Sequence, residues 1–81
     1  MDDMKEQQWL CPVKPEEIPA YLNWVAQDSG GDWCGYENEP KPNAEFLMWV
    51  DYDDINFITS EYLCTGEYNA NWRNTLQKVP R

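Results

Sequence analysis

Two adjacent glycines, Gly30 and Gly31, separate two short runs in which side chains alternate in character. The first run covers residues 23–28 and the second covers residues 32–37. A period of two is typical of β-strands, and glycines between two such runs supply the positive φ angles that a tight hairpin turn requires. This stretch therefore predicts an antiparallel β-hairpin.

The length of the turn decides which side chains share a face of that hairpin. With a two-residue turn at the glycines, Trp24 and Ala26 lie on the same face as Trp33 and Gly35. A shift of one residue would exchange the two faces, because successive side chains of a strand point to opposite sides. The sequence leaves both registers open.

The centre of the chain carries a second extended signal. Residues 45–52 alternate and predict a strand whose buried face holds Phe46, Met48, Val50 and Tyr52. Residues 39–43 contain two prolines, which lack the N–H that a central strand must donate, so we expect them to form a connecting loop. Residues 55–63 suit a further strand, which Gly66 closes.

Both ends of the chain carry helical signals. Trp72, Leu76 and Val79 recur at helical spacing, with asparagines before them as caps and Pro80 after them, so the sequence predicts a C-terminal helix of about two turns. Residues 15–22 predict either one short helical turn or a bend, because Pro19 interrupts the pattern.

These elements define the expected fold class and domain organisation. The class is α+β, with a small antiparallel sheet of three or four strands arranged as a meander and a short C-terminal helix packed on it. Residues 1–15 are expected to be an N-terminal tail, and residues 16–81 a single small domain.

A chain of 81 residues must build its core from a few large side chains. Five Trp, five Tyr and two Phe serve that purpose, since each ring buries about 150–250 Å². The expected core residues are Trp24 or Trp33, with Phe46, Met48, Trp72 and Leu76. The remaining aromatic residues exceed what a core of this size requires, and we expect some of them at the surface as interface anchors.

The charge is concentrated in the middle of the chain. From Glu16 to Glu67 there are twelve carboxylates and one cation, Lys41, whereas the residues after Glu67 carry only cations. Such a negative field repels nucleic acids and anionic membranes. The expected partner is therefore a basic protein surface, with no direct binding to nucleic acid or to membrane.

Residues that carry catalysis or hold a cofactor are scarce. The chain has no His and only three Cys, at positions 11, 34 and 64, which we expect to be free thiols. Asp51, Asp53 and Asp54 offer oxygen ligands, but an EF-hand loop would need Gly at position 56 and Glu at position 62, where Asn and Tyr stand. We expect no enzymatic activity, no cofactor and no metal site.

Two blocks of the sequence, NWVAQDSGGDWCGYENEP and NWRNTLQKVP, resemble a family of short proteins encoded by tailed bacteriophages and prophages. The family pattern falls on Trp24, Ala26, Asp28, Gly31, Trp33, Tyr36, Glu37, Pro40, Trp72, Arg73, Thr75, Leu76 and Pro80. Residues 41–68 lie outside the resemblance. The resemblance implies a phage or prophage origin, action in the bacterial host cytoplasm and no known enzymatic role.

The leading hypothesis is a non-catalytic binding module that occupies a basic surface of a host or phage protein. One alternative is a DNA mimic directed against a defence protein, and another is a structural or accessory phage domain. The candidate partner-binding residues combine aromatic rings with nearby carboxylates: Trp33, Tyr36, Glu37, Glu39, Trp49, Asp51, Asp53 and Asp54.

Overall fold

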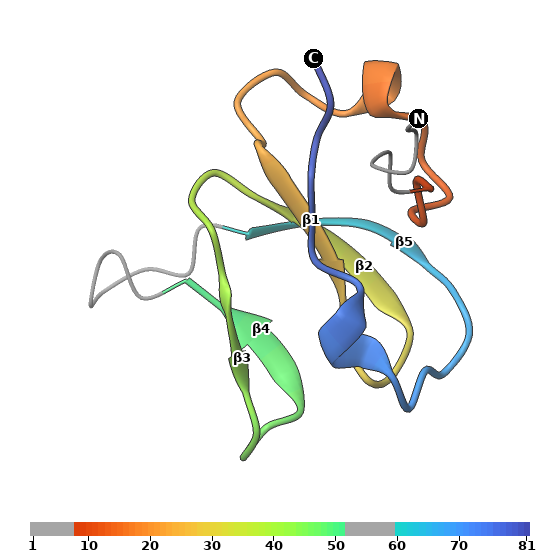
Figure 1. The fold of residues 1–81 in the computed structure, drawn as a ribbon, viewed down its shortest axis with the longest axis vertical. Helices are drawn as coiled ribbons and strands as arrows, with labels where there is room; N and C mark the ends of the chain where they lie inside the picture. Colours follow the sequence, from red (N-terminus) through yellow and green to blue (C-terminus); the bar gives the residue numbers. More distant parts are fainter. Residues whose placement is uncertain (1–7, 52–59) are drawn as a thin grey trace, which may run out of the picture.

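The computed structural model describes residues 8–51 and 60–81. These residues form two antiparallel β-sheets and two single turns of 3-10 helix, η2 (Pro15–Glu17) and η3 (Trp72–Asn74) (Figure 1). The first sheet has the strand order β5-β2-β1-β6, and the second pairs β3 with β4. The strands are β1 (Trp24–Gln27), β2 (Asp32–Tyr36), β3 (Lys41–Asn43), β4 (Met48–Val50), β5 (Ser60–Thr65) and β6 (Gln77–Lys78).

The predicted hairpin is confirmed as β1 and β2, but its register is shifted by one residue from that of a two-residue turn. Trp24 pairs with Tyr36, and Ala26 pairs with Cys34. The Gly31 N–H donates to the Asp28 carbonyl oxygen at 2.9 Å, and Gly31 has a φ of 108°. The turn therefore has three residues, with a glycine at the left-handed position, and this is a common alternative to the two-residue turn.

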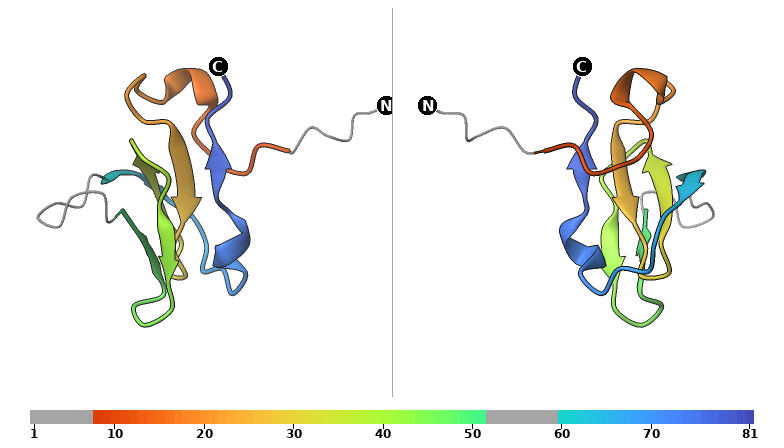
Figure 2. Two further views of the ribbon diagram at one scale, coloured as in Figure 1. Left: turned by 60° about the vertical axis from the view of Figure 1, so that its left-hand side comes forward. Right: turned by 90° about the vertical axis from the view of Figure 1, so that its right-hand side faces the viewer.

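Both faces of the β1–β2 hairpin are buried. One face carries Val25 and Trp33, and it is covered by Cys11, Ile18 and Leu22 of the chain that precedes β1. Gly35 leaves room for this cover, since a Cβ atom at that position would lie 2.7 Å from Leu22 Cδ1. Figure 2 shows the preceding segment and the β3–β4 sheet on opposite sides of β1.

The other face carries Ala26 and Tyr36, and it packs against Trp49 of β4 and Trp72 of η3. The two indole rings meet edge to face, with their centroids 5.7 Å apart. The Trp49 indole N–H also donates to the Gln27 carbonyl oxygen at 3.0 Å. The small second sheet is thereby fixed to the first by its one buried tryptophan.

Two predictions for the centre of the chain are wrong. Residues 41–43, expected in a loop, form strand β3, because an edge strand tolerates Pro42 where a central strand would not. Most of the predicted strand over residues 45–52 is instead a turn followed by the three-residue β4, and this arrangement leaves Phe46 exposed while Trp49 is buried. Tyr52 lies outside the described residues.

The prediction of a C-terminal helix is also wrong. Only Trp72–Asn74 form a helical turn, and the Asn71 side chain makes no capping hydrogen bond. The chain then extends as β6 and pairs with β1, where Lys78 lies opposite Trp24. The free edge of β1 offers ladder hydrogen bonds that a helix of two turns cannot match in stability.

The sheet is not a meander, because β3 and β4 leave it and β5 returns to pair with β2. In the β2–β5 ladder, Trp33 pairs with Cys64, whereas the next residue, Cys34, pairs with Tyr62. Leu63 is skipped in this pairing and forms a β-bulge. The fourth predicted strand is found as β5, as far as the described residues extend. The part of that prediction over residues 55–59 lies outside them.

The segment preceding β1 is attached to the distant β6. The Leu10 N–H donates to Gln77 Oε1 at 2.9 Å, and Gln77 Nε2 donates to the Gln8 carbonyl oxygen at 2.8 Å. The side-chain amide of Gln77 thus makes two hydrogen bonds to the backbone of this segment, one as acceptor and one as donor. Cys11 is buried in the core beneath this segment, so residues 8–14 pack on the sheet.

Candidate functional site

Half of the candidate partner-binding residues lie inside the fold. Trp33, Tyr36 and Trp49 are core side chains, and Asp51 is buried as well. The two-sided burial of the hairpin accounts for this, because rings on either face meet a covering layer. A partner approaching the folded protein therefore cannot use these four residues as surface contacts.

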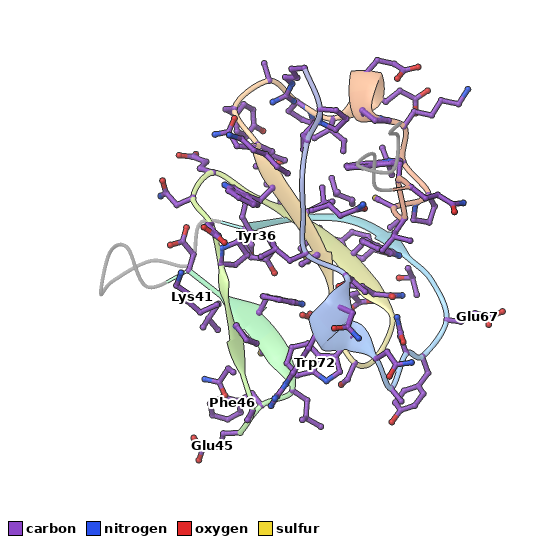
Figure 3. The ribbon with its side chains drawn as sticks, in the orientation of Figure 1. Tyr36, Lys41, Glu45, Phe46, Glu67 and Trp72 are labelled. Carbon is purple, nitrogen blue, oxygen red and sulfur yellow. The ribbon has the colours of Figure 1, made fainter. Side chains whose placement is uncertain are left out.

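Glu37 and Glu39 are exposed in the segment between β2 and β3, whereas Asp53 and Asp54 lie outside the described residues. Within residues 8–51 and 60–81, the exposed carboxylates do not all gather in one place. Glu45 lies at the lower end of the molecule and Glu67 at one side of it (Figure 3), while Glu16 belongs to η2 at the upper end (Figure 1).

Three loops come together at the lower end of the molecule, and we call this region the loop end. It consists of the β1–β2 turn (residues 28–31), the β3–β4 turn (residues 44–47) and the segment after β5 (residues 66–69). Ser29 joins all three: its N–H donates to the Leu47 carbonyl oxygen at 3.3 Å, and its own carbonyl oxygen accepts from the Asn69 N–H at 3.1 Å. A further bond, from the Gly66 N–H to the Gly31 carbonyl oxygen, measures 2.8 Å.

The buried side chain of Gln27 holds two of these loops from inside. Its Nε2 donates to the carbonyl oxygens of Gly31 and Glu67, each at 3.1 Å. Its Oε1 accepts from Asn69 Nδ2 at 2.9 Å. One amide thus satisfies groups from two loops, and buried polar groups satisfied in this way restrict the backbone to one arrangement.

The β3–β4 turn is ordered by its own polar contacts. Asn43 Oδ1 accepts from the N–H groups of both Glu45 and Phe46 at 2.9 Å. The turn ends at Leu47, which has a φ of 57° and is the only described non-glycine residue with a positive φ. This conformation disfavours a leucine by about 1–2 kcal/mol, and glycine or asparagine would be more stable there.

Large apolar side chains project from this ordered framework. Phe46 is 66% exposed, Leu47 is 48% exposed and Tyr68 is 75% exposed. Figure 3 shows Phe46 beside Glu45 at the lower end, pointing away from the sheets. The loop end therefore displays apolar side chains on a hydrogen-bonded backbone, with the carboxylates of Glu45 and Glu67 on the same two loops.

Sequence reasoning did not name Phe46, Leu47 and Tyr68 among the partner-binding candidates. The alternation over residues 45–52 predicted that Phe46 is buried. Residues 41–43 were expected to form a loop, so no strand was predicted before residues 44–47 and no turn was predicted there. The sequence signal for this turn was Asn43, since an Asn side chain often accepts a hydrogen bond from the backbone N–H two residues further along the chain and so begins a turn.

The described residues also include titratable groups that are buried, such as Tyr36, or half-buried, such as Asp28 and Cys34. Burial raises the pKa of the Cys34 thiol to about 11, and burial likewise raises the pKa of the Tyr36 hydroxyl. Burial is the main cause of the raised pKa of Asp28. The hydrogen bond from the Trp49 backbone N–H lowers this pKa, and the charge of Asp32 raises it further. Across residues 8–51 and 60–81, no three His, Cys, Asp or Glu side chains are grouped to hold a metal ion.

A hollow of about 400 Å³ lies near the opposite end, lined by Asn23 and the segment from Lys78 to Arg81. The Arg81 guanidinium donates to four backbone carbonyl oxygens, those of Ile18, Pro19, Ala20 and Leu22, at 2.9–3.2 Å. Its N–H groups are thus largely used in attaching the end of the chain to the turn before β1. Arg81 acts there as a structural contact.

No protein-family model, curated protein or solved structure matches this chain. Within the described part of the chain, no helix has the length and apolar character needed to cross a membrane.

Proposed function

We propose that the protein is a non-catalytic binding module, and that its loop end docks on a basic surface of another protein. The observation that carries the proposal is Leu47: an exposed leucine occupies a left-handed position where stability alone favours glycine or asparagine. Local strain of this kind clusters at functional sites. We infer that Leu47 is kept for a contact with the partner.

The neighbouring residues fit the same role. Phe46 and Tyr68 offer the large rings that anchor protein interfaces, and the ordered loops reduce the entropy lost on binding. Glu45 lies beside Phe46 (Figure 3) and adds local negative charge, and the chain as a whole has a net charge of −9. Such a field speeds encounter with a cationic partner and disfavours acidic ones.

This proposal replaces the buried candidates Trp33, Tyr36, Trp49 and Asp51 by Phe46, Leu47 and Tyr68. It does not favour DNA mimicry, because duplex DNA presents regularly spaced charge along one face. Here Glu45, Glu67 and the carboxylates of η2 lie in separate parts of the molecule. A phage or prophage origin and a bacterial cytoplasmic partner remain part of the proposal, and they guide the choice of lysate below.

The test compares matched variants of the full chain as immobilised bait in bacterial lysate at low salt. Phe46→Ala removes an exposed ring at the loop end, whereas Leu10→Ala removes an apolar side chain that is 46% exposed in the segment preceding β1. Neither change should alter the free energy of unfolding by more than about 0.5 kcal/mol, because the Phe46 side chain is largely in solvent and the Leu10 side chain is about half in solvent.

Wild type and Leu10→Ala should retain the same protein, and Phe46→Ala should retain at least about tenfold less of it. Raising the salt to about 0.5 M should release the captured protein by screening the charge. Equal capture by Phe46→Ala, or loss with Leu10→Ala alone, would place the binding surface elsewhere.

A further inference from the structure

Two of the three cysteines are neighbours in space although they are far apart in the chain. Cys11 is buried in the segment that precedes β1, and Cys64 is half-buried in β5. Cys11 belongs to the apolar cluster around Val25 and Trp33, Cys64 packs against that cluster, and the Cys64 side chain lies close enough to act on the Cys11 thiol. Each thiol is reduced in this structure.

The topology keeps these two thiols together. Cys64 lies opposite Trp33 in the β2–β5 ladder, on the face of the sheet that the segment preceding β1 covers. That segment is attached to β6 directly before Cys11, where the Leu10 N–H donates to Gln77 Oε1, and a bond within the segment, from the Trp9 indole N–H to the Val13 carbonyl oxygen at 2.9 Å, closes the chain around Cys11. The two sulfur atoms are thus held in proximity by contacts that do not involve sulfur.

The third cysteine occupies a different environment. Cys34 is half-buried on the opposite face of the hairpin, where it packs against the cluster formed by Ala26, Tyr36, Trp49 and Trp72. Its thiol lies close enough to the Tyr36 hydroxyl for each group to act on the other. It therefore serves as an internal control for any reaction of the other two.

We propose that Cys11 and Cys64 are an oxidation site, at which exchange with a low-molecular-weight disulfide forms an intramolecular disulfide between the segment preceding β1 and strand β5. The resulting bond would lock the cover of the sheet in place. This site is separate from the loop end, and its existence does not depend on the proposed binding function.

The exchange proceeds in two balanced steps. The Cys64 thiolate, which is the more exposed of the two, attacks a sulfur of the small disulfide and releases one small thiolate. The Cys11 thiolate then attacks the Cys64 sulfur and releases the second. Two protein thiols are oxidised, one small disulfide is reduced to two thiols, and two protons pass from the protein thiols to the released thiolates.

Burial controls the rate of the second step. It raises the pKa of the Cys11 thiol to about 11, with the neighbouring Cys64 adding to the effect and a backbone hydrogen bond at Val13 opposing it. Only a small fraction of Cys11 is ionised near neutral pH, so ring closure should accelerate as the pH rises toward 9.

The experiment treats the folded full chain with oxidised glutathione at about pH 8.5 and maps the products by mass spectrometry. The expected product has lost two hydrogen atoms, contains a Cys11–Cys64 linkage, and forms equally well in Cys34→Ser. Closing so long a loop should raise the Tm by roughly 10 °C. Cys11→Ala, which keeps the buried position apolar, should stop at a glutathione adduct on Cys64.

A dominant linkage that includes Cys34, or glutathione adducts without ring closure in wild type, would overturn the proposal. So would a Cys11–Cys64 product that forms no faster in the folded chain than in denaturant, because proximity in the fold is the basis of the inference. Failure of the loop-end variants to change partner capture has no bearing on this result.

Discussion

The two adjacent glycines of the β1–β2 turn have different surroundings. Gly31 has a φ of 108°, and a Cβ atom on it would lie 2.5 Å from the Gly66 carbonyl oxygen, whereas a Cβ on Gly30 would meet nothing within 4 Å. We expect Gly31→Ala to cost about 3 kcal/mol or more in unfolding free energy, since it combines backbone strain with a clash. Gly30→Ala should stay within about 0.5 kcal/mol of wild type in the same denaturant titration, and equal effects would contradict the observed turn.

Leu47 allows stability and binding to be separated at a single residue. Leu47→Ala removes the side chain and keeps the strained left-handed backbone, while Leu47→Asn removes the same apolar contact and suits that backbone. Leu47→Asn should therefore be more stable than Leu47→Ala by about 1 kcal/mol in denaturant unfolding, and both should lose the captured partner. Retained capture in either variant would show that the leucine is not a contact residue.

At the scale of elements, the sequence predicted correctly those strands whose signals lie within one short stretch of the chain. Alternation and glycines were enough to find β1 and β2, because both signals lie within one short stretch. The register was left open, since it depends on whether the turn has two or three residues. The C-terminal segment was misassigned because its conformation depends on the free edge of β1, more than forty residues away in the chain.

The candidate site was predicted only in its chemical character. Acidic and aromatic residues were expected at a protein-binding surface, yet several of the named rings are buried and the exposed ones were not named. The reason is that both faces of the hairpin are covered: the segment preceding β1 buries Trp33, and β4 together with η3 buries Tyr36. Burial of that kind depends on tertiary packing and leaves no periodic signal in the sequence.

The attachment of the segment preceding β1 can be tested through Gln77. Gln77→Leu keeps side-chain bulk but removes the bonds to Leu10 and Gln8. The Leu10 amide should then exchange with deuterium at least about tenfold faster, while the Val79 amide, which bonds to the Asn23 carbonyl oxygen, should stay protected. Unchanged exchange at Leu10 would show that other contacts hold the segment.

At the scale of the whole molecule, the stability of the fold depends on pH through the carboxylate of Asp28. The folded pKa of Asp28 is raised, mainly by burial, above the ordinary value of 3.8. The folded state therefore binds this proton more tightly than the unfolded state, and ionised Asp28 destabilises the fold at all pH values above its raised pKa. The destabilisation disappears as the pH falls through that pKa toward 3.8.

Asp28→Asn tests this dependence because an amide oxygen can still accept the N–H bond from Trp49, which measures 3.0 Å. The variant should melt at a higher temperature than wild type at pH 7, and its advantage should shrink as the pH is lowered into the acidic range. Glu45→Gln, at an exposed position, serves as the control for the loss of one negative charge. An Asp28→Asn variant that is less stable at pH 7 would contradict the assignment.

Three loops form one ordered surface at the lower end of the molecule, and residue-resolved amide hydrogen exchange of the wild-type chain is the sharpest check of this order. Ser29, Gly31, Gly66 and Asn69 lie in loops, yet each donates its N–H to a backbone carbonyl oxygen at 2.8–3.3 Å. We expect protection at these four amides approaching that of β1 and β2. Exchange at the rates of an unstructured chain, with the strands still protected, would contradict it.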